Sequence, residues 1–272
     1  MDRNRRRLNN ALRIPQFLSA LLVLLLATYA QAAAAVAATP ATTPAGETVH
    51  FPSQGESVRG ILYKPAGAGP FPAIVVIHEW WGLTDWVQQQ AADLAQQGYV
   101  ALAVDLYRGQ SATDPEMAHE LMRGLPQDRG VGYLTAAVAY LKTRKDVQAE
   151  RIGAVGWCMG GGFALQLAIA EPTLRAVAIN YGALDTDPTQ LKKIHAQVLG
   201  NFGALDRGIT PEDVQAFAKE MAALGHPVNV KEYADAGHAF QNPNNKTGYR
   251  PQDTTDADQR MQTFFAKTLK QR

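Results

Sequence analysis

One short stretch of the chain combines a reactive side chain with the spacing that a nucleophile requires. Cys158 lies in Gly156-Trp157-Cys158-Met159-Gly160, between a run that reads as a strand and an apolar, helix-like run. In a sharp strand-to-helix turn, flanking glycines avoid backbone collisions and the central side chain is lifted off the backbone. The helix N-terminus that follows favours a thiolate. The pattern therefore predicts a catalytic nucleophile rather than a buried structural cysteine.

A thiol nucleophile needs a partner that holds its proton, because a free thiol is only slightly ionised at neutral pH. His238 lies in a loop after a predicted strand at 227–233, and Asp206 follows a predicted strand at 197–202. The order nucleophile, acid, histidine is that of a hydrolase triad in which the acid fixes the tautomer of the imidazole. Asp185 is the competing acid, and the motif order favours Asp206.

A second motif, His78-Glu79-Trp80-Trp81-Gly82, ends the first central strand. It lacks the second histidine of a zinc-binding H-E-x-x-H motif, and the chain has one cysteine, so we expect no metal and no cofactor. The backbone N–H groups of Met159 and Trp80 are candidates for an oxyanion hole, in which each donor contributes about 3 kcal/mol. We expect Trp81 to line the substrate pocket.

Predicted strands and helices alternate along most of the chain. Short apolar runs, such as 73–78 and 99–106, are typical of strands buried on both faces of a parallel sheet. An alternating pair at 49–51 and 58–63 precedes them, and a final helix is predicted over 256–269. This order predicts an α/β-hydrolase fold, a mostly parallel sheet with helices on both faces. We expect the irregular segment 107–128 to overhang the active site.

The N-terminus has the features of a secretory signal peptide. Five arginines precede an apolar run, and Ala30-Gln31-Ala32 is a small-residue cleavage site. We predict a signal peptide over 1–32, a flexible lead-in over 33–46 and a single domain over 47–272. The mature protein is then exported, periplasmic or secreted, without stable membrane association.

Charge and cysteine content narrow the range of partners. Residues 1–32 hold five of the 26 Lys and Arg and one of the 25 Asp and Glu, so their removal leaves a net charge of −3. That balance does not favour nucleic-acid binding. A lone cysteine in an exported protein cannot form an internal disulfide, which is consistent with use as a nucleophile. We expect a monomer that binds a small-molecule ester or lactone.

Four segments together resemble the dienelactone hydrolase family: Gly-Trp-Cys-Met-Gly-Gly-Gly, His-Glu-Trp-Trp-Gly-Leu, Val-Asp-Leu-Tyr and Ala-Gly-His-Ala-Phe. The resemblance covers nearly the whole of the predicted mature chain. It implies an enzyme of the carboxymethylenebutenolidase type (a carboxylic ester hydrolase), which cleaves a small ester or lactone through a Cys158–His238–Asp206 triad and an acyl-thioester intermediate. It also implies that Glu79 lies beside the thiol and helps to activate it when substrate binds.

The chain departs from that family at the residues that hold a substrate carboxylate. Asn242 occupies the position of an arginine found in the best-known members, and Arg108 is shifted by about one position from another. Tyr107 and Arg108 are nevertheless candidates for substrate binding. An exported carboxylesterase of different or broad specificity is an alternative, and so is a non-catalytic binding protein that keeps the turn as scaffold. A dinucleotide-binding oxidoreductase is excluded, because the glycines do not form G-x-G-x-x-G.

Overall fold

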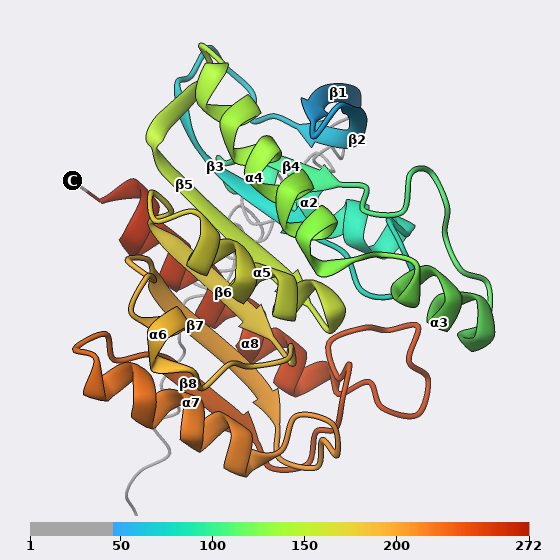
Figure 1. Ribbon diagram of the computed structural model, residues 1–272, viewed down its shortest axis with the longest axis vertical. Helices are drawn as coiled ribbons and strands as arrows, with labels where there is room; N and C mark the ends of the chain where they lie inside the picture. The colour runs from blue at the N-terminus through green and yellow to red at the C-terminus, as the bar shows by residue number, and fades with distance from the viewer. Residues whose placement is uncertain (1–45, 272) are drawn as a thin grey trace, which may run out of the picture. The chain divides into compact units, whose positions relative to one another are not determined.

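A sheet of eight strands in the order β1-β2-β4-β3-β5-β6-β7-β8 organises residues 46–271, the part of the chain that the computed structural model describes (Figure 1). The predicted signal peptide and all but the last residue of the lead-in lie outside these residues. The strands are β1 (Glu47–Ser53), β2 (Glu56–Tyr63), β3 (Phe71–Ile77), β4 (Val100–Val104), β5 (Val147–Trp157), β6 (Ala176–Asn180), β7 (Gln197–Gly203) and β8 (Asn229–Tyr233). The β1–β2 and β2–β4 pairs are antiparallel, and the other pairs are parallel. The α/β-hydrolase fold predicted from the sequence is confirmed.

Helices cover both faces of this sheet. They are α2 (Asp85–Gln96), α3 (Pro115–Arg123), α4 (Gln127–Thr143), α5 (Met159–Ala170), α6 (Pro188–Leu191), α7 (Pro211–Ala223), α8 (Pro251–Phe265) and the π-helical turn η1 (Ala266–Lys270). One core cluster joins the sheet to α4, α5 and α7, and the other joins it to α2 and α8. In Figure 1 the helices α4 and α5 lie in front of the sheet and α8 lies behind it.

The apolar runs of the sequence become the strands that are buried on both faces. All of β4 and the residues from Ala73 to Ile77 in β3 are inaccessible to solvent. Val and Ile fit this environment because their branched side chains pack well on a pleated surface. Both strands end at the same edge of the sheet because they are parallel, and polar residues follow each of them there. That edge carries the candidate active site.

Capping residues place the starts of several helices where the sequence predicts them. The Asp114 carboxylate accepts a hydrogen bond from the Met117 N–H at the start of α3, and Thr210 and Asp213 form a capping box at α7. The last helix differs from its prediction. It begins at Pro251, five residues before the predicted start at 256, because proline is well tolerated in the first turn. Within residues 46–271 no helix is both long and apolar enough to cross a bilayer.

Candidate active site

Cys158 is held in a strained turn between β5 and α5. Its φ is +55° and its ψ is −121°, a backbone conformation that residues other than glycine rarely adopt. The Cys158 N–H donates to the Asn180 carbonyl at 3.0 Å, and its own carbonyl accepts from the N–H groups of Gly161 and Gly162. Such strain costs about 1–3 kcal/mol and persists where the surrounding structure enforces it. The turn therefore has the geometry of a nucleophile elbow.

Two glycines of the motif are required by close packing. A Cβ at position 156 would lie 1.9 Å from the Gly160 carbonyl oxygen. A Cβ at position 160 would lie 2.3 Å from the carbonyl oxygen of Ile77, in the neighbouring strand β3. No side chain fits at these distances, so both positions need glycine. The Gly-x-Cys-x-Gly spacing thus reflects the approach of α5 to β3 and β5.

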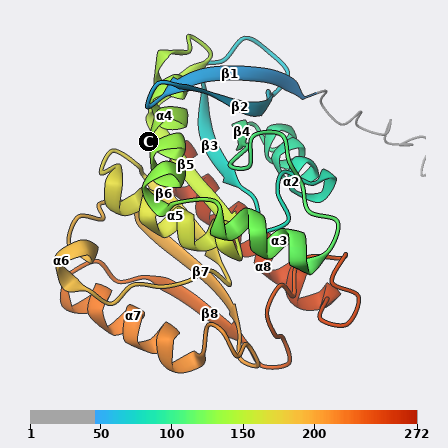
Figure 2. The same cartoon turned by 45° about the vertical axis from the view of Figure 1, so that its right-hand side comes forward.

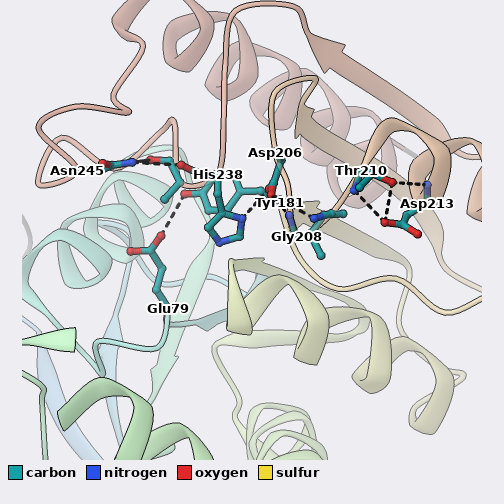
Figure 3. Close-up of polar contacts among 10 residues, drawn as sticks. Glu79, Tyr181, Asp206, Gly208, Thr210, Asp213, His238 and Asn245 are labelled. Carbon is teal, nitrogen blue, oxygen red and sulfur yellow. Dashed lines mark hydrogen bonds and ion pairs between the residues drawn. The ribbon is translucent and has the colours of Figure 1, made fainter. Parts of the chain in front are cut away.

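His238 and Asp206 are brought together at the ends of neighbouring strands. The His238 Nδ1 atom lies 2.6 Å from the Asp206 Oδ2 atom (Figure 3). The other carboxylate oxygen of Asp206 accepts from the N–H groups of Gly208 at 2.8 Å and Ile209 at 3.1 Å. Because this carboxylate only accepts, Nδ1 carries the proton that it shares with Asp206. This contact fixes the tautomer that the ring adopts when it is neutral, and Nε2 is the ring nitrogen available to the thiol.

The histidine and the acid form an ion pair. Burial acts to lower the pKa of His238, but its hydrogen bonds with Asp206 and Cys158 outweigh this and raise the pKa to about 10. Burial likewise acts to raise the pKa of Asp206, yet the hydrogen bonds from His238 and from the loop amides hold it below its ordinary value. The pair therefore consists of an imidazolium and a carboxylate at neutral pH.

Asp185, the competing acid of the sequence analysis, does not meet His238 in the structure. Its carboxylate accepts a hydrogen bond from the Asp187 N–H at 2.8 Å, at an exposed position before the short helix α6. This is a local turn contact of the kind that aspartate commonly makes. Of the two acids, only Asp206 contacts the histidine.

Glu79 lies on the opposite side of His238 from Asp206 (Figure 3). The loop that carries it is anchored by His78, which is fully buried. The Leu106 N–H donates to His78 Nε2 at 3.2 Å, so the proton is on Nδ1, which donates to the Glu79 carbonyl at 2.5 Å. Burial is the main cause that lowers the pKa of His78, which keeps this ring neutral. His78 is thus a positioning residue for Glu79 and Trp80.

The Glu79 carboxylate is almost completely buried and has two neutral donors. Asn242 Nδ2 donates to Glu79 Oε2 at 2.5 Å, and the Tyr181 hydroxyl donates to Oε1 at 3.3 Å. Burial raises the pKa of Glu79 to about 7, although Asn242, His238 and Tyr181 each act to lower it. The side-chain nitrogen of Asn242 therefore donates to the Glu79 carboxylate and is not directed at a substrate.

A cavity of about 1240 Å³ opens over these side chains at the carboxyl edge of the sheet. Glu79, Cys158 and His238 all line it. Aromatic and aliphatic side chains make most of its wall, namely Trp80, Trp81, Met122, Leu125, Phe163 and Leu184. Met122 and Leu125 come from the segment 107–128, whose helix α3 lies near the start of α5 (Figure 2). That segment therefore borders the site, as the sequence predicts.

The two residues whose N–H groups are candidates for the oxyanion hole line the same cavity as the thiol. Met159 is the first residue of α5, so its N–H has no partner within the helix. Met159 and Trp80 both line the cavity that contains Cys158. Among residues 46–271, no group of three His, Cys, Asp or Glu side chains is arranged to hold a metal ion.

Tyr107 and Arg108 are not brought to the cavity. The Tyr107 side chain is buried, and its hydroxyl donates to the Met159 sulfur at 3.2 Å. The Arg108 guanidinium donates to both oxygens of Glu56 at 2.6 Å and to the Tyr133 hydroxyl at 3.0 Å. Neither residue lines the cavity, because its polar group already has partners elsewhere. The structure thus gives no contact through which either would bind a substrate directly.

Two residues that the sequence analysis missed hold the site in place. Tyr181, which directly follows β6 with a φ of +39°, packs edge-on against the His238 ring at 5.3 Å between centroids. The Asn245 amide donates to the carbonyls of His238 and Ala239, at 3.1 and 3.3 Å. A polar residue in the Asn-Pro-Asn-Asn segment that follows the histidine is a detectable turn signal. Tyr181 carries no such signal, because it reads as the end of a buried strand.

The sheet order, the elbow and the histidine–acid pair at its carboxyl edge define an α/β-hydrolase. A sequence model of the dienelactone hydrolase family matches residues 58–269. The chain belongs to the dienelactone hydrolase family, and it is a dienelactone hydrolase-like hydrolase. The resemblance identified from the sequence motifs is confirmed.

Individual proteins support the same assignment. A protein of Aquifex aeolicus, provisionally named carboxymethylenebutenolidase, is 29% identical over 232 residues, which cover 83% of this chain and 100% of that protein. A crystal structure from Klebsiella pneumoniae, provisionally described as a dienelactone hydrolase, superimposes with a TM-score of 0.75 at 27% identity, over 82% of this chain and 98% of that one. The structure named m3DLH gives a TM-score of 0.77 at 28% identity, over 84% of this chain and 99% of that one.

Proposed function

We propose that the protein hydrolyses a small carboxylic ester or lactone through Cys158, His238 and Asp206. The observation that carries this proposal is the hydrogen-bonded pair of Asp206 and His238, which stands with Cys158 in one open cavity. A cationic imidazole next to the sulfur, together with the N-terminus of α5, favours the negative charge of a thiolate. A non-catalytic scaffold has no need for a strained cysteine beside a fixed histidine tautomer.

The proposed reaction has two halves. The Cys158 sulfur attacks the carbonyl carbon of the ester, and the negative charge that develops on the oxygen is stabilised by the N–H groups of Met159 and Trp80. The carbon–oxygen bond then breaks, and the proton on His238 Nε2 passes to the departing alkoxide. An acyl-thioester remains. Water attacks it, and the neutral His238 takes one proton of that water. The carbon–sulfur bond then breaks, the acid product leaves, and the thiolate and the imidazolium are restored.

Glu79 is proposed to assist the thiol. It lines the same cavity as Cys158, and its charge is held next to His238. With a pKa of about 7, its carboxyl group can gain or lose a proton under the conditions in which the enzyme works. This property suits a group that helps to activate the nucleophile when substrate binds.

The first test measures turnover of para-nitrophenyl acetate and dienelactone before and after treatment with iodoacetamide. We expect turnover to disappear as mass spectrometry detects alkylation of Cys158. Cys158→Ala should lower kcat by about 10³-fold or more without unfolding the protein, which circular dichroism checks. Retained turnover in the alanine variant would exclude the thiol mechanism. An intact, alkylatable thiol with no turnover of either compound would support a binding protein.

We also propose that the enzyme is exported. The support is the arginine-rich start, the apolar run and the small-residue site Ala30-Gln31-Ala32, which precede the folded domain. Expression of the full chain in a bacterium, followed by N-terminal sequencing of the periplasmic and culture fractions, tests this. We expect mature protein that begins just after residue 32. Full-length protein confined to the cytoplasm would contradict it.

A further inference from the structure

We propose that the preferred substrates are uncharged esters with an extended apolar group, and that a substrate carboxylate is discriminated against. This inference rests on the proposed function, since it concerns the same cavity. It is carried by two features of the cavity. Among its described lining residues the only cations are His238, which is already paired with Asp206, and the exposed Lys246, and its apolar wall is larger than a small lactone needs.

Two residues at the positions considered for binding a substrate carboxylate, Asn242 and Arg108, have partners elsewhere. Asn242 is buried, its amide nitrogen donates to Glu79, and its amide oxygen accepts from the Asn244 N–H at 2.9 Å. Arg108 is turned towards Glu56 and Tyr133, which together occupy its guanidinium. These contacts direct the amide of Asn242 to Glu79 and the guanidinium of Arg108 away from the cavity.

The cations that line the cavity offer a substrate carboxylate little support, because the His238 ring is already paired with Asp206. Lys246 is the one lysine or arginine among the described residues that line it. This lysine is exposed, and its ammonium group donates only to the Pro243 carbonyl, at 3.3 Å. A long, solvated side chain of this kind holds an ion weakly. Glu79 lies at the base, so a substrate carboxylate that entered deeply would meet a like charge in a site with little water.

The apolar wall favours substrates with hydrocarbon to bury. Trp80 and Trp81 pack edge-to-face at 4.9 Å between centroids, and Trp80 is held in the same way against His119 of α3 at 4.8 Å. These contacts keep the indole rings in place. Phe163 and Leu184 line the same cavity. Each methylene that a substrate buries on such a surface strengthens binding by about fourfold at most.

Three esters with the same leaving group separate charge from size: para-nitrophenyl acetate, para-nitrophenyl hexanoate and the mono-para-nitrophenyl ester of adipic acid. Hexanoate and adipate have the same chain length and differ by a terminal carboxylate. Rates are measured at pH 8, where Glu79 is mainly ionised. We expect kcat/KM for hexanoate to exceed that for acetate by about tenfold. We expect kcat/KM for hexanoate to exceed kcat/KM for adipate by about tenfold or more.

Added cations provide the decisive control. Asn242→Arg should narrow the difference between hexanoate and adipate, but it also changes the contact with Glu79 and can impair folding. Met122→Arg is therefore the second variant, because Met122 is 36% exposed and lines the cavity without contacting Glu79. We expect it to raise kcat/KM for adipate relative to hexanoate by about fivefold or more. Met122→Gln, which is neutral and of similar length, should leave that ratio unchanged.

The outcomes distinguish this inference from the proposed function. Equal rates for hexanoate and adipate would overturn the inference while leaving the thiol hydrolase intact. A preference for adipate that is lost in Lys246→Ala would also overturn it, and would assign anion binding to that lysine. No turnover of any of the three esters, with Cys158 still reactive towards iodoacetamide, would overturn the proposed function itself and this inference with it.

Discussion

Asp206 and Glu79 are two buried carboxylates on opposite sides of one histidine, and their surroundings drive them to opposite states (Figure 3). Asp206 faces the His238 ring and two backbone N–H groups, and its pKa is lowered despite burial. Glu79 has an amide and a phenol as partners, and burial raises its pKa to about 7. The comparison teaches that burial alone does not set the charge of an acid. The hydrogen bonds from His238 and two backbone N–H groups together overcome the burial of Asp206. Two neutral donors and the charge of His238, without a hydrogen bond from its ring, do not overcome the burial of Glu79.

The largest effect that tests this comparison is the loss of the acid in the proposed triad. Asp206→Asn should lower kcat by about 10³–10⁴-fold, because an amide nitrogen would face His238 Nδ1 and reverse the tautomer. Steady-state kinetics with para-nitrophenyl esters measures it.

Asp185→Asn is the matched control, because it makes the same chemical change at a turn. It should alter kcat by less than about twofold. A larger loss in this variant than in Asp206→Asn would transfer the role of triad acid to Asp185.

The next effect is on stability. The pKa of Glu79 is about 7 in the folded protein and 4.5 for an ordinary glutamate, so between these values the folded state binds a proton that the unfolded state has released. The free energy of unfolding therefore falls as the pH rises from about 4.5 to 7, by about 3 kcal/mol through this group. Glu79→Gln removes this dependence.

Urea denaturation at pH 5 and pH 8 measures that difference. Relative to the parent protein, the free energy of unfolding of Glu79→Gln should increase by about 3 kcal/mol from pH 5 to pH 8, because all other groups titrate alike in both proteins. Asp206 acts in the opposite sense. Its lowered pKa contributes stability that is present above the ordinary value near 3.8 and is lost as the pH falls below it. A parallel pH dependence in both proteins would refute the raised pKa of Glu79.

A smaller effect is expected at the hydroxyl that contacts Glu79. Tyr181→Phe removes a donor 3.3 Å from Glu79 Oε1 and should raise the pKa of Glu79 further, by less than about one unit. The same urea series locates the pH at which the unfolding free energy stops changing. Tyr133→Phe is the control, because its hydroxyl contacts Glu56 and Arg108 instead. A shift of equal size in both variants would show that the effect does not act through Glu79.

The smallest effect is expected at Arg108. Arg108→Ala should change kcat/KM for neutral and anionic esters by less than about twofold, because the guanidinium is paired with Glu56 at the surface. The ester series described above measures it. A selective loss of adipate hydrolysis by tenfold or more would mean that Arg108 leaves Glu56 and reaches the substrate.

Much of the architecture could be predicted because its signals are local. The short apolar runs of β3 and β4 predict strands buried on both faces, and Asp114 and Thr210 mark helix starts. The start of the last helix was predicted five residues too late, because its first turn is polar and lacks an apolar period. The short helix α6 was missed, because four residues carry no periodicity.

The amino-acid sequence alone determined the candidate cysteine nucleophile, its strand-to-helix turn and the chain order of acid and histidine, since each depends on neighbours within a few residues. Only the tertiary structure decided which acid meets His238, that Asn242 donates to Glu79 across 163 positions of the chain, and that Arg108 turns away to Glu56. These contacts depend on how separate loops meet at the carboxyl edge of the sheet. Their energies come from burial and from the direction of individual hydrogen bonds, which no local spacing encodes.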